Sequence, residues 1–293
     1  MPKIGDYTLC KVETGTFGLD GGAMFGIVPK PLWSRQITPD EQNRIPLHMR
    51  CLLLQSTDRL IMIDAGIGHK YSEKFAGIYA IDHSKHSICA AFDQLGVSTD
   101  EVTDVILTHL HFDHCGGATY RNENGELGLT FRNAQHYVQR EHYEWARSSN
   151  PKEAASFLKE NISPLANSGK LTLVDGKKEL LPGISVIPVG GHTEAQQLVK
   201  ISDGDSTLVY VADLIPTTHH VKPAWTMAYD IEPLVSIDEK MQFLEQAVEN
   251  EWDLFFEHDP EVEVASVEKT EKGIRLVDAR ALEQLHLETG APN

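Results

Sequence analysis

An apolar run that leads straight into a cluster of titratable side chains constrains this chain more than any other feature. The stretch ILTHLHFDHCGG, from Ile106 to Gly117, contains three histidines and one aspartate. Burying such groups without partners is costly, and a divalent cation removes that cost. Residues two apart in an extended segment project from the same side, so His109 and His111 can share one cation. The stretch therefore predicts a fold in which a strand carries a metal site at its carboxyl end.

Three further apolar segments end in a side chain that can bind a metal ion. They are ISVIPVGGH, STLVYVAD and WDLFFEH, which end at His192, Asp213 and His258. Strand ends commonly build sites, because the strand fixes the side chain while the following loop leaves access. Together with the first stretch they give the candidate ligand set: His109, His111, Asp113, His114, His192, Asp213 and His258.

Seven candidate ligands are more than one cation needs, and they suit two neighbouring cations. We expect one cation to be held by His109, His111 and His192, the other by Asp113, His114 and His258, and both by a bridging Asp213. Imidazole and carboxylate ligands without thiolate suit zinc, iron or manganese, and zinc is our first expectation.

The ligand string resembles that of the metallo-β-lactamase-fold hydrolases. The resemblance runs from about Tyr7 to about His258 and includes MIDAG (62–66), which is similar to the strand-ending Asp-x-Gly of that family. It implies an α/β fold, a four-layer αββα sandwich with the site on one edge between the sheets. It also implies that Asp64 orients a metal ligand or the histidine loop. A turn aspartate at the end of a hairpin is the alternative for Asp64.

Departures from the family pattern narrow the choice of relatives. True β-lactamases usually lack a bridging aspartate, whereas lactonases, organophosphate hydrolases and glyoxalase II carry the full ligand pattern, so Asp213 favours the latter group. Lactonases often have a tyrosine three positions after that aspartate. Pro216 stands there in this chain, and Tyr229 is the candidate to play a similar part. No basic cluster for glutathione is evident, which weakens the glyoxalase II interpretation.

The resemblance and the ligand set predict hydrolysis of a small ester or lactone through a hydroxide that bridges two metal ions. Asp113 is the candidate for orienting this hydroxide and passing a proton to the leaving group. Hydrolysis of phosphotriesters or phosphodiesters at the same site is the alternative. A di-iron redox enzyme is favoured less, because such proteins usually have an acidic ligand where this chain has Phe112 and also carry a flavin domain.

Two irregular stretches supply candidates for substrate binding. The first, from Gly21 to Asn43, is a long connection between strands, and such loops often act as active-site lids. The second follows Asp213. The candidate substrate contacts are Met24, Phe25, Trp33, His219, Trp225 and Tyr229, and Met227 extends the apolar wall. Ordinary packing beneath long loops is the alternative for the apolar side chains, and a solvated loop is the alternative for His219.

Composition limits the partners of the protein. The formal net charge is −17, with 43 acidic and 26 basic residues, and such a surface repels phosphate backbones and anionic lipids. We therefore expect a small-molecule substrate and neither a nucleic-acid nor a membrane partner. No apolar run approaches the length of a membrane span, and the start of the chain lacks the apolar core of a secretory signal. The scattered cysteines indicate reduced thiols of a cytoplasmic protein.

The chain organisation fits one domain over residues 1–293, and a homodimer that covers residues 21–43 is compatible with it. Helical spacing predicts helices over 84–96, 140–150, 151–166 and 236–252. In the last of these, Ser236 is the expected N-cap, with Glu239 completing a capping box.

Overall fold

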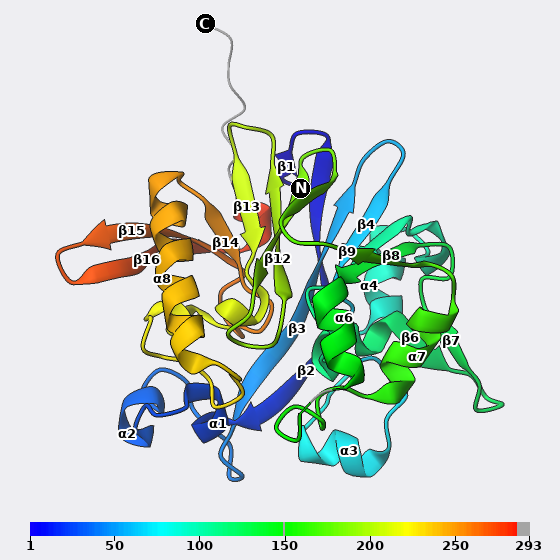
Figure 1. Cartoon of the computed structure of the whole chain (residues 1–293), viewed down its shortest axis with the longest axis horizontal. Coiled ribbons are helices and arrows are strands. Elements are labelled where there is room, and N and C mark those ends of the chain that lie inside the picture. The colour runs from blue at the N-terminus through cyan, green and yellow to red at the C-terminus, as the bar shows by residue number, and fades with distance from the viewer. Residues whose placement is uncertain (149, 286–293) are drawn as a thin grey trace, which may run out of the picture.

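Two seven-stranded sheets lie at the centre of the molecule (Figure 1). The computed structural model describes residues 1–148 and 150–285. Leu52 and Ile61 of the first sheet pack with Val199 and Leu208 of the second, and all four side chains are fully buried. One hydrophobic core therefore lies between the two sheets.

The first sheet has the strand order β1-β2-β3-β4-β5-β8-β9. Its strands are β1 (Lys3–Ile4), β2 (Tyr7–Asp20), β3 (Arg44–Gln55), β4 (Leu60–Ile63), β5 (Asp104–Ile106), β8 (Gln135–Gln139) and β9 (Leu171–Val174). The pairs β4–β5, β5–β8 and β8–β9 are parallel. The carboxyl ends of these four strands therefore share one edge of the sheet.

The second sheet follows the order of the chain, from β10 to β16. Its strands are β10 (Lys178–Leu181), β11 (Ile184–Val189), β12 (Gln196–Ser202), β13 (Thr207–Tyr210), β14 (Asp253–Phe255), β15 (Val264–Thr270) and β16 (Gly273–Arg280). Only β13 and β14 pair in parallel among these strands, so the residues that follow both leave the sheet at the same edge.

Helices cover the outer face of each sheet (Figure 1). The first sheet packs against α4 (Ile88–Leu95), α6 (Arg140–Arg147) and α7 (Lys159–Asn167), through buried side chains such as Phe92 and Leu165. The second sheet packs against α8 (Pro233–Glu249), through Phe243 and Leu244. This order of layers confirms the predicted αββα sandwich.

Short elements complete the described chain. They are α1 (Gly21–Phe25), α2 (Lys30–Trp33), α3 (Glu73–Ile78), α5 (Phe112–Cys115), β6 (Thr119–Arg121), β7 (Leu127–Leu129) and the 3₁₀ turns η1 (Thr99–Glu101), η2 (Gly116–Ala118), η3 (Ala212–Leu214), η4 (Thr218–Val221) and η5 (Leu282–Gln284). The prediction of an irregular stretch from residue 21 to 43 was wrong in part, because α1 and α2 lie within it. Asp20 starts α1 by accepting a hydrogen bond from the Ala23 amide at 2.9 Å.

Two predicted helix starts were wrong. The helix expected over 151–166 begins only at Lys159. The helix expected to begin after Ser236 begins at Pro233, with Glu232 at the N-cap position. Proline suits the first turn of a helix because its fixed φ is already helical and its missing N–H has no partner there. Ser236 is consequently a buried residue inside α8 rather than its cap.

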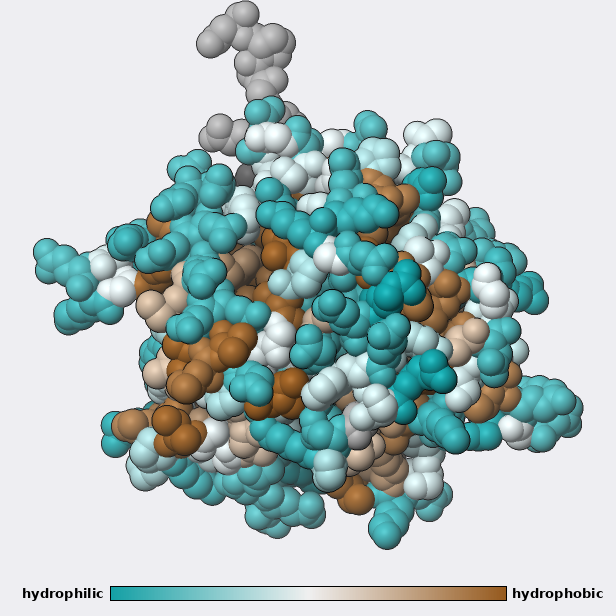
Figure 2. All heavy atoms as spheres, viewed as in Figure 1, coloured by the Kyte–Doolittle hydropathy of each residue, from teal (hydrophilic) through white to brown (hydrophobic). Residues whose placement is uncertain are grey.

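The surface is mostly hydrophilic, and apolar areas interrupt it on the face that Figure 2 shows. Apolar side chains gather there over the amino-terminal part of α8 and beside the α1–α2 segment (Figure 2). The exposed members in these elements include Ile27, Leu32, Leu234, Val235 and Met241. Across the described ranges, no helix is both long enough and apolar enough to cross a bilayer.

Candidate metal centre

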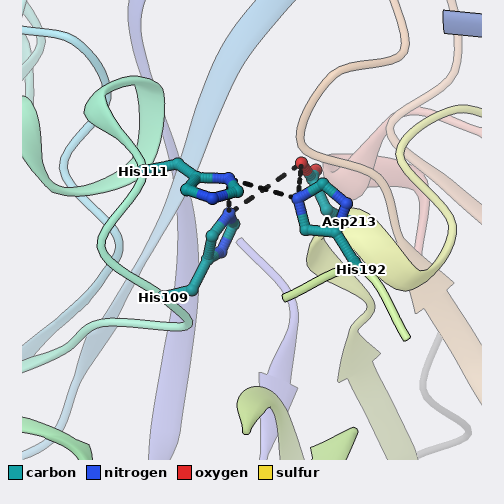
Figure 3. Close-up of side chains that lie close together, drawn as sticks. All are labelled: His109, His111, His192 and Asp213. Atoms are coloured by element: carbon teal, nitrogen blue, oxygen red, sulfur yellow. Dashed lines mark hydrogen bonds and ion pairs between the residues drawn. The ribbon is translucent and has the colours of Figure 1, made fainter. Parts of the chain in front are cut away.

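Seven side chains that can bind metal ions meet where strands of both sheets end. One cluster contains His109, His111, His192 and Asp213, and the other contains Asp113, His114 and His258, with the ligand atoms of each cluster within 4.8 Å of one another. All seven side chains are buried. These are the residues that the sequence predicted, in the same division between two groups. Figure 3 shows the four side chains of the first cluster pointing toward one another.

The first cluster has the spacing that a small cation requires. The Nδ1 atom of His111 lies 3.1 Å from Nε2 of His109 and 3.2 Å from Nε2 of His192. The Asp213 carboxylate lies 3.2 Å from Nε2 of His192. Nitrogens bound to one tetrahedral zinc ion at its usual bond length lie roughly 3.3 Å apart. The distances from His111 are close to this value, while the Asp213 carboxylate lies 3.9 Å from Nε2 of His109, so the donor atoms surround one position where a small cation could bind.

The second cluster is built in the same way and shares a carboxylate with the first. The Nε2 atoms of His114 and His258 are 3.1 Å apart, and each lies 3.8 Å from the Asp113 carboxylate. Asp213 reaches this cluster too, at 3.5 Å from His114 and 3.3 Å from His258. Asp213 thus lies between the two groups, in the position expected of a bridging ligand.

The electrostatics differ within the centre: burial lowers the pKa of His109 and His111, whereas carboxylates raise that of His192 and His258. Burial favours the neutral form of His192, but Asp213 and Asp230 outweigh burial and raise the pKa of this imidazole to about 10. For His258, burial is likewise outweighed by Asp213, and the pKa rises to about 9. An oxygen of Asp213 has no hydrogen-bond partner within the described chain although it is buried. Protons or divalent cations can supply positive charge here, and the donor set suits the cations.

Asp64 holds the histidine loop from the end of β4. It adopts a positive φ of 56°, which turns the chain sharply after the strand. Its carboxylate accepts hydrogen bonds from the amide and hydroxyl of Thr108, at 2.7 and 2.6 Å. It also lies 3.1 Å from Nδ1 of His114. These contacts place Asp64 where it can orient both the loop and one ligand, which is the role that the family resemblance implies.

Several acidic side chains that contact the ligand histidines were not identified from the sequence. The outer ring nitrogen of a metal-binding histidine usually donates to a carboxylate or carbonyl. In this structure Glu257 lies 3.0 Å from Nδ1 of His114, and Asp230 lies 3.0 Å from Nδ1 of His192. Glu153 lies 3.4 Å from Nε2 of His111. Only Glu257 offered a sequence signal, since it directly precedes a ligand in a buried segment.

Glu239 has a different role from the predicted helix cap. Its two carboxylate oxygens accept hydrogen bonds from the amides of Gly190 and Gly191, at 2.7 and 3.0 Å. A Cβ atom on Gly191 would lie 2.3 Å from the Ser236 amide nitrogen, so only glycine allows α8 to approach this closely. The loop that ends at His192 is therefore fixed on the start of α8.

A cavity of about 160 Å³ opens onto both clusters. His111, Asp113, His192, Asp213 and His258 line it together with the apolar and aromatic side chains of Leu19, Met24, Tyr79, Phe112, Met227 and Tyr229. The segment from Lys152 to Ser156 contributes a further part of the lining, including Glu153. A ligand in this cavity would contact metal ligands on one side and apolar groups on the other.

The candidate substrate contacts fall into two groups. Met24 and Tyr229 line the cavity, whereas the part of the lining that the structure describes does not include Phe25, Trp33, Trp225 or His219. Phe25 stacks on Trp33, with ring centroids 5.3 Å apart, and Trp225 packs edge-on against Phe25 at 5.6 Å. The ring centroids of His219 and Phe25 are 6.5 Å apart. Trp33, Trp225 and His219 therefore lie around Phe25, the neighbour of Met24.

Comparison with known protein sequences gives one family. Residues 46–258 match the model of the metallo-beta-lactamase superfamily. An N-acyl homoserine lactonase of Bacillus cereus is 28% identical over 176 residues, which are 57% of this chain and 63% of that protein. The matched region thus spans less than two thirds of that relative. An N-acyl homoserine lactonase of Bacillus thuringiensis is 24% identical over 237 residues, 78% of this chain and 86% of that protein.

Comparison with solved structures agrees with the sequence comparison. A probable metal-dependent hydrolase from Staphylococcus aureus superposes with a TM-score of 0.85 at 32% identity, covering 96% of this chain and 100% of that one. AidC, a dizinc quorum-quenching lactonase, superposes with a TM-score of 0.77 at 21% identity, covering 96% and 97% of the two chains. At this lower identity the second likeness concerns the fold alone.

Proposed function

The chain belongs to the metallo-β-lactamase superfamily of hydrolases, and from this premise we propose that it opens small lactones or esters at a pair of divalent cations, with zinc as the first candidate. One observation carries the proposal: both ligand clusters face a single cavity whose other walls are largely apolar. Lactones and esters combine a polar reacting carbonyl with an apolar remainder, which suits this division. The similarity to N-acyl homoserine lactonases supports the same substrate class.

The ligands of this chain would hold the cations in place. When bound, two divalent cations make a hydroxide available near neutral pH and polarise a substrate oxygen. Asp213 reaches the histidines of both clusters and would fix the distance between them. Asp113 belongs to the second cluster and lines the cavity, so its carboxylate can carry a proton to the leaving oxygen.

Tyr229 would bind the substrate from the opposite wall. Its side chain lines the cavity, and burial raises the pKa of its phenol well above the ordinary value. The hydroxyl therefore stays protonated near neutral pH and can donate a hydrogen bond to a substrate oxygen. In this way Tyr229 would replace the tyrosine that lactonases often have at the position of Pro216. Met24 and Met227 would contact the apolar part of the substrate.

A parallel substrate screen tests this proposal. Zinc-loaded protein is assayed with N-acyl homoserine lactones, simple lactones, aryl esters, an aryl phosphodiester, a phosphotriester and a chromogenic cephalosporin. We expect kcat/KM for at least one lactone or ester to exceed that for every phosphoester and the cephalosporin by about 100-fold or more. A preference of that size for phosphoesters would instead establish the phosphoesterase alternative.

A pair of variants ties the activity to the centre. Asp213→Ala removes the shared carboxylate and should abolish most of the hydrolysis, whereas Asp205→Ala changes an exposed aspartate just before β13 and should leave it unchanged. Metal content measured on both proteins shows whether the loss follows the cations. Wild-type activity in Asp213→Ala would contradict the proposed role of the bridge.

A further inference from the structure

One buried imidazole outside both clusters connects the two loops that form the first cluster. His142 lies on α6 and contacts each loop through one ring nitrogen. Its Nε2 atom accepts a hydrogen bond from the Leu110 amide at 2.8 Å, and its Nδ1 atom lies 2.7 Å from the Glu194 carbonyl oxygen. Leu110 stands between His109 and His111 in the chain, and Glu194 follows His192 by two residues.

The two contacts determine the tautomer of His142. A backbone N–H can only donate, so Nε2 must carry a lone pair toward Leu110. A carbonyl oxygen can only accept, so Nδ1 must carry the hydrogen toward Glu194. Both nitrogens are thus used by the backbone, and neither is left to bind a cation. His142 is fully buried and packs 5.7 Å from the ring of Phe157. Burial lowers the pKa of His142 to about 3, which keeps the ring neutral.

The position of these contacts matters because each lies next to a ligand. His109 and His111 come from one loop and His192 comes from the other, so the first cluster exists only when the two loops keep their separation. The Leu110 amide donates directly to His142 between the two ligands of the first loop. The ring of His142 lies 6.1 Å from that of His109, and both of its nitrogens bond to the backbone, so it supports the loop and is not itself a ligand.

We propose that His142 is a positioning residue: it sets the distance between the loop of His109 and His111 and the loop of His192, and thereby the metal affinity of the first cluster. This inference rests on the proposed function only in requiring that the first cluster binds a cation. It concerns affinity rather than the reaction, and it does not depend on the substrate.

The test measures metal affinity in variants of His142. His142→Phe keeps a planar ring but removes both hydrogen bonds. His142→Gln offers an amide oxygen as an acceptor for Leu110. His142→Asn is a smaller polar substitute that also lacks the reach to Leu110, and it replaces the Phe variant if circular dichroism shows that the latter does not fold. His136→Phe is the matched control, because His136 on β8 is equally buried while its ring nitrogens have no hydrogen-bond partner in the described ranges.

Each substitution is made in the His258→Ala background, which removes one ligand of the second cluster and so isolates the first. Zn²⁺ affinity is measured by chelator competition, and Co²⁺ absorption reports the ligand geometry. We expect His142→Phe, or His142→Asn in its place, to weaken Zn²⁺ binding by about 10- to 100-fold. His142→Gln should stay within about fivefold of the background protein, and His136→Phe within about twofold.

Three results with the variants would overturn the inference. They are unchanged Zn²⁺ affinity in His142→Phe, an equal loss in His136→Phe, and a His142→Gln variant as weak as His142→Phe. Absence of Zn²⁺ binding by the wild-type chain would overturn it as well. The proposed function fails separately, if the wild-type chain binds two Zn²⁺ ions with the expected dependence on His142 but hydrolyses no lactone or ester.

Discussion

Acid should destabilise this protein through His136, which lies fully buried on β8. Burial lowers the pKa of His136 from 6.5 to about 4. Between these two pH values the unfolded chain binds a proton that the folded chain does not. The contribution of His136 to stability is therefore complete above pH 6.5 and is lost as the pH falls toward 4.

The size of the effect follows from the same values. Each pH unit inside this window removes about 1.4 kcal/mol, so at pH 5 the wild-type chain has lost about 2 kcal/mol relative to pH 7.5. Phenylalanine at this position does not titrate. The free energy of unfolding of wild-type protein, minus that of His136→Phe, should thus fall by about 2 kcal/mol between pH 7.5 and pH 5.

Urea denaturation of both proteins at the two pH values, with a chelator present, provides the measurement. Taking the difference between the proteins cancels the titration of His142 and of other groups that both chains contain. A change in that difference below about 0.5 kcal/mol would refute the reasoning, because it would mean that His136 binds a proton equally well in the folded chain.

Three further predictions concern the centre itself. Asp230→Asn removes the carboxylate that lies 3.0 Å from Nδ1 of His192. This variant should bind Zn²⁺ about 10- to 100-fold more weakly in a chelator competition. Unchanged affinity would show that His192 needs no such partner. Tyr229→Phe removes one hydrogen bond to the substrate and should lower kcat/KM about tenfold without changing the metal content. Steady-state kinetics measure this effect, and an unaltered kcat/KM would exclude the contact. Removal of metal with a chelator should lower the melting temperature and abolish hydrolysis, and added Zn²⁺ should restore both; full activity of metal-free protein would contradict the proposed function.

The ligand clusters could be predicted from the sequence because each ligand lies within a few residues of a strand end. His192 follows β11, Asp213 follows β13 and His258 follows β14, and each of these strands is a short apolar run that stands out in the chain. Parallel pairing of β13 and β14 then brings two of the ligands to one edge. A local pattern was sufficient here because the strand itself determines where its last side chain lies.

The supporting groups could not be predicted because their roles depend on contacts between distant segments. Asp230 meets His192 across 38 residues, and His142 meets Glu194 across 52. Glu239 has the spacing of a helix cap, yet its carboxylate binds the loop before His192. Phe25 and Trp33 have the composition of a substrate wall, but Phe25 fills the space between Trp33 and His220. In each case the packing of two segments decides what a side chain does.

The division of the ligands between the two sheets has a consequence for how the protein is made. His109, His111, Asp113 and His114 all precede the second sheet, whereas His192, Asp213 and His258 belong to it. During synthesis the first four ligands leave the ribosome well before the last one, so the first cluster is complete only when the chain extends beyond residue 213, and the second only beyond residue 258. Cations held by these ligands would therefore be captured only after part of the second sheet has been made, and they would then connect the two sheets.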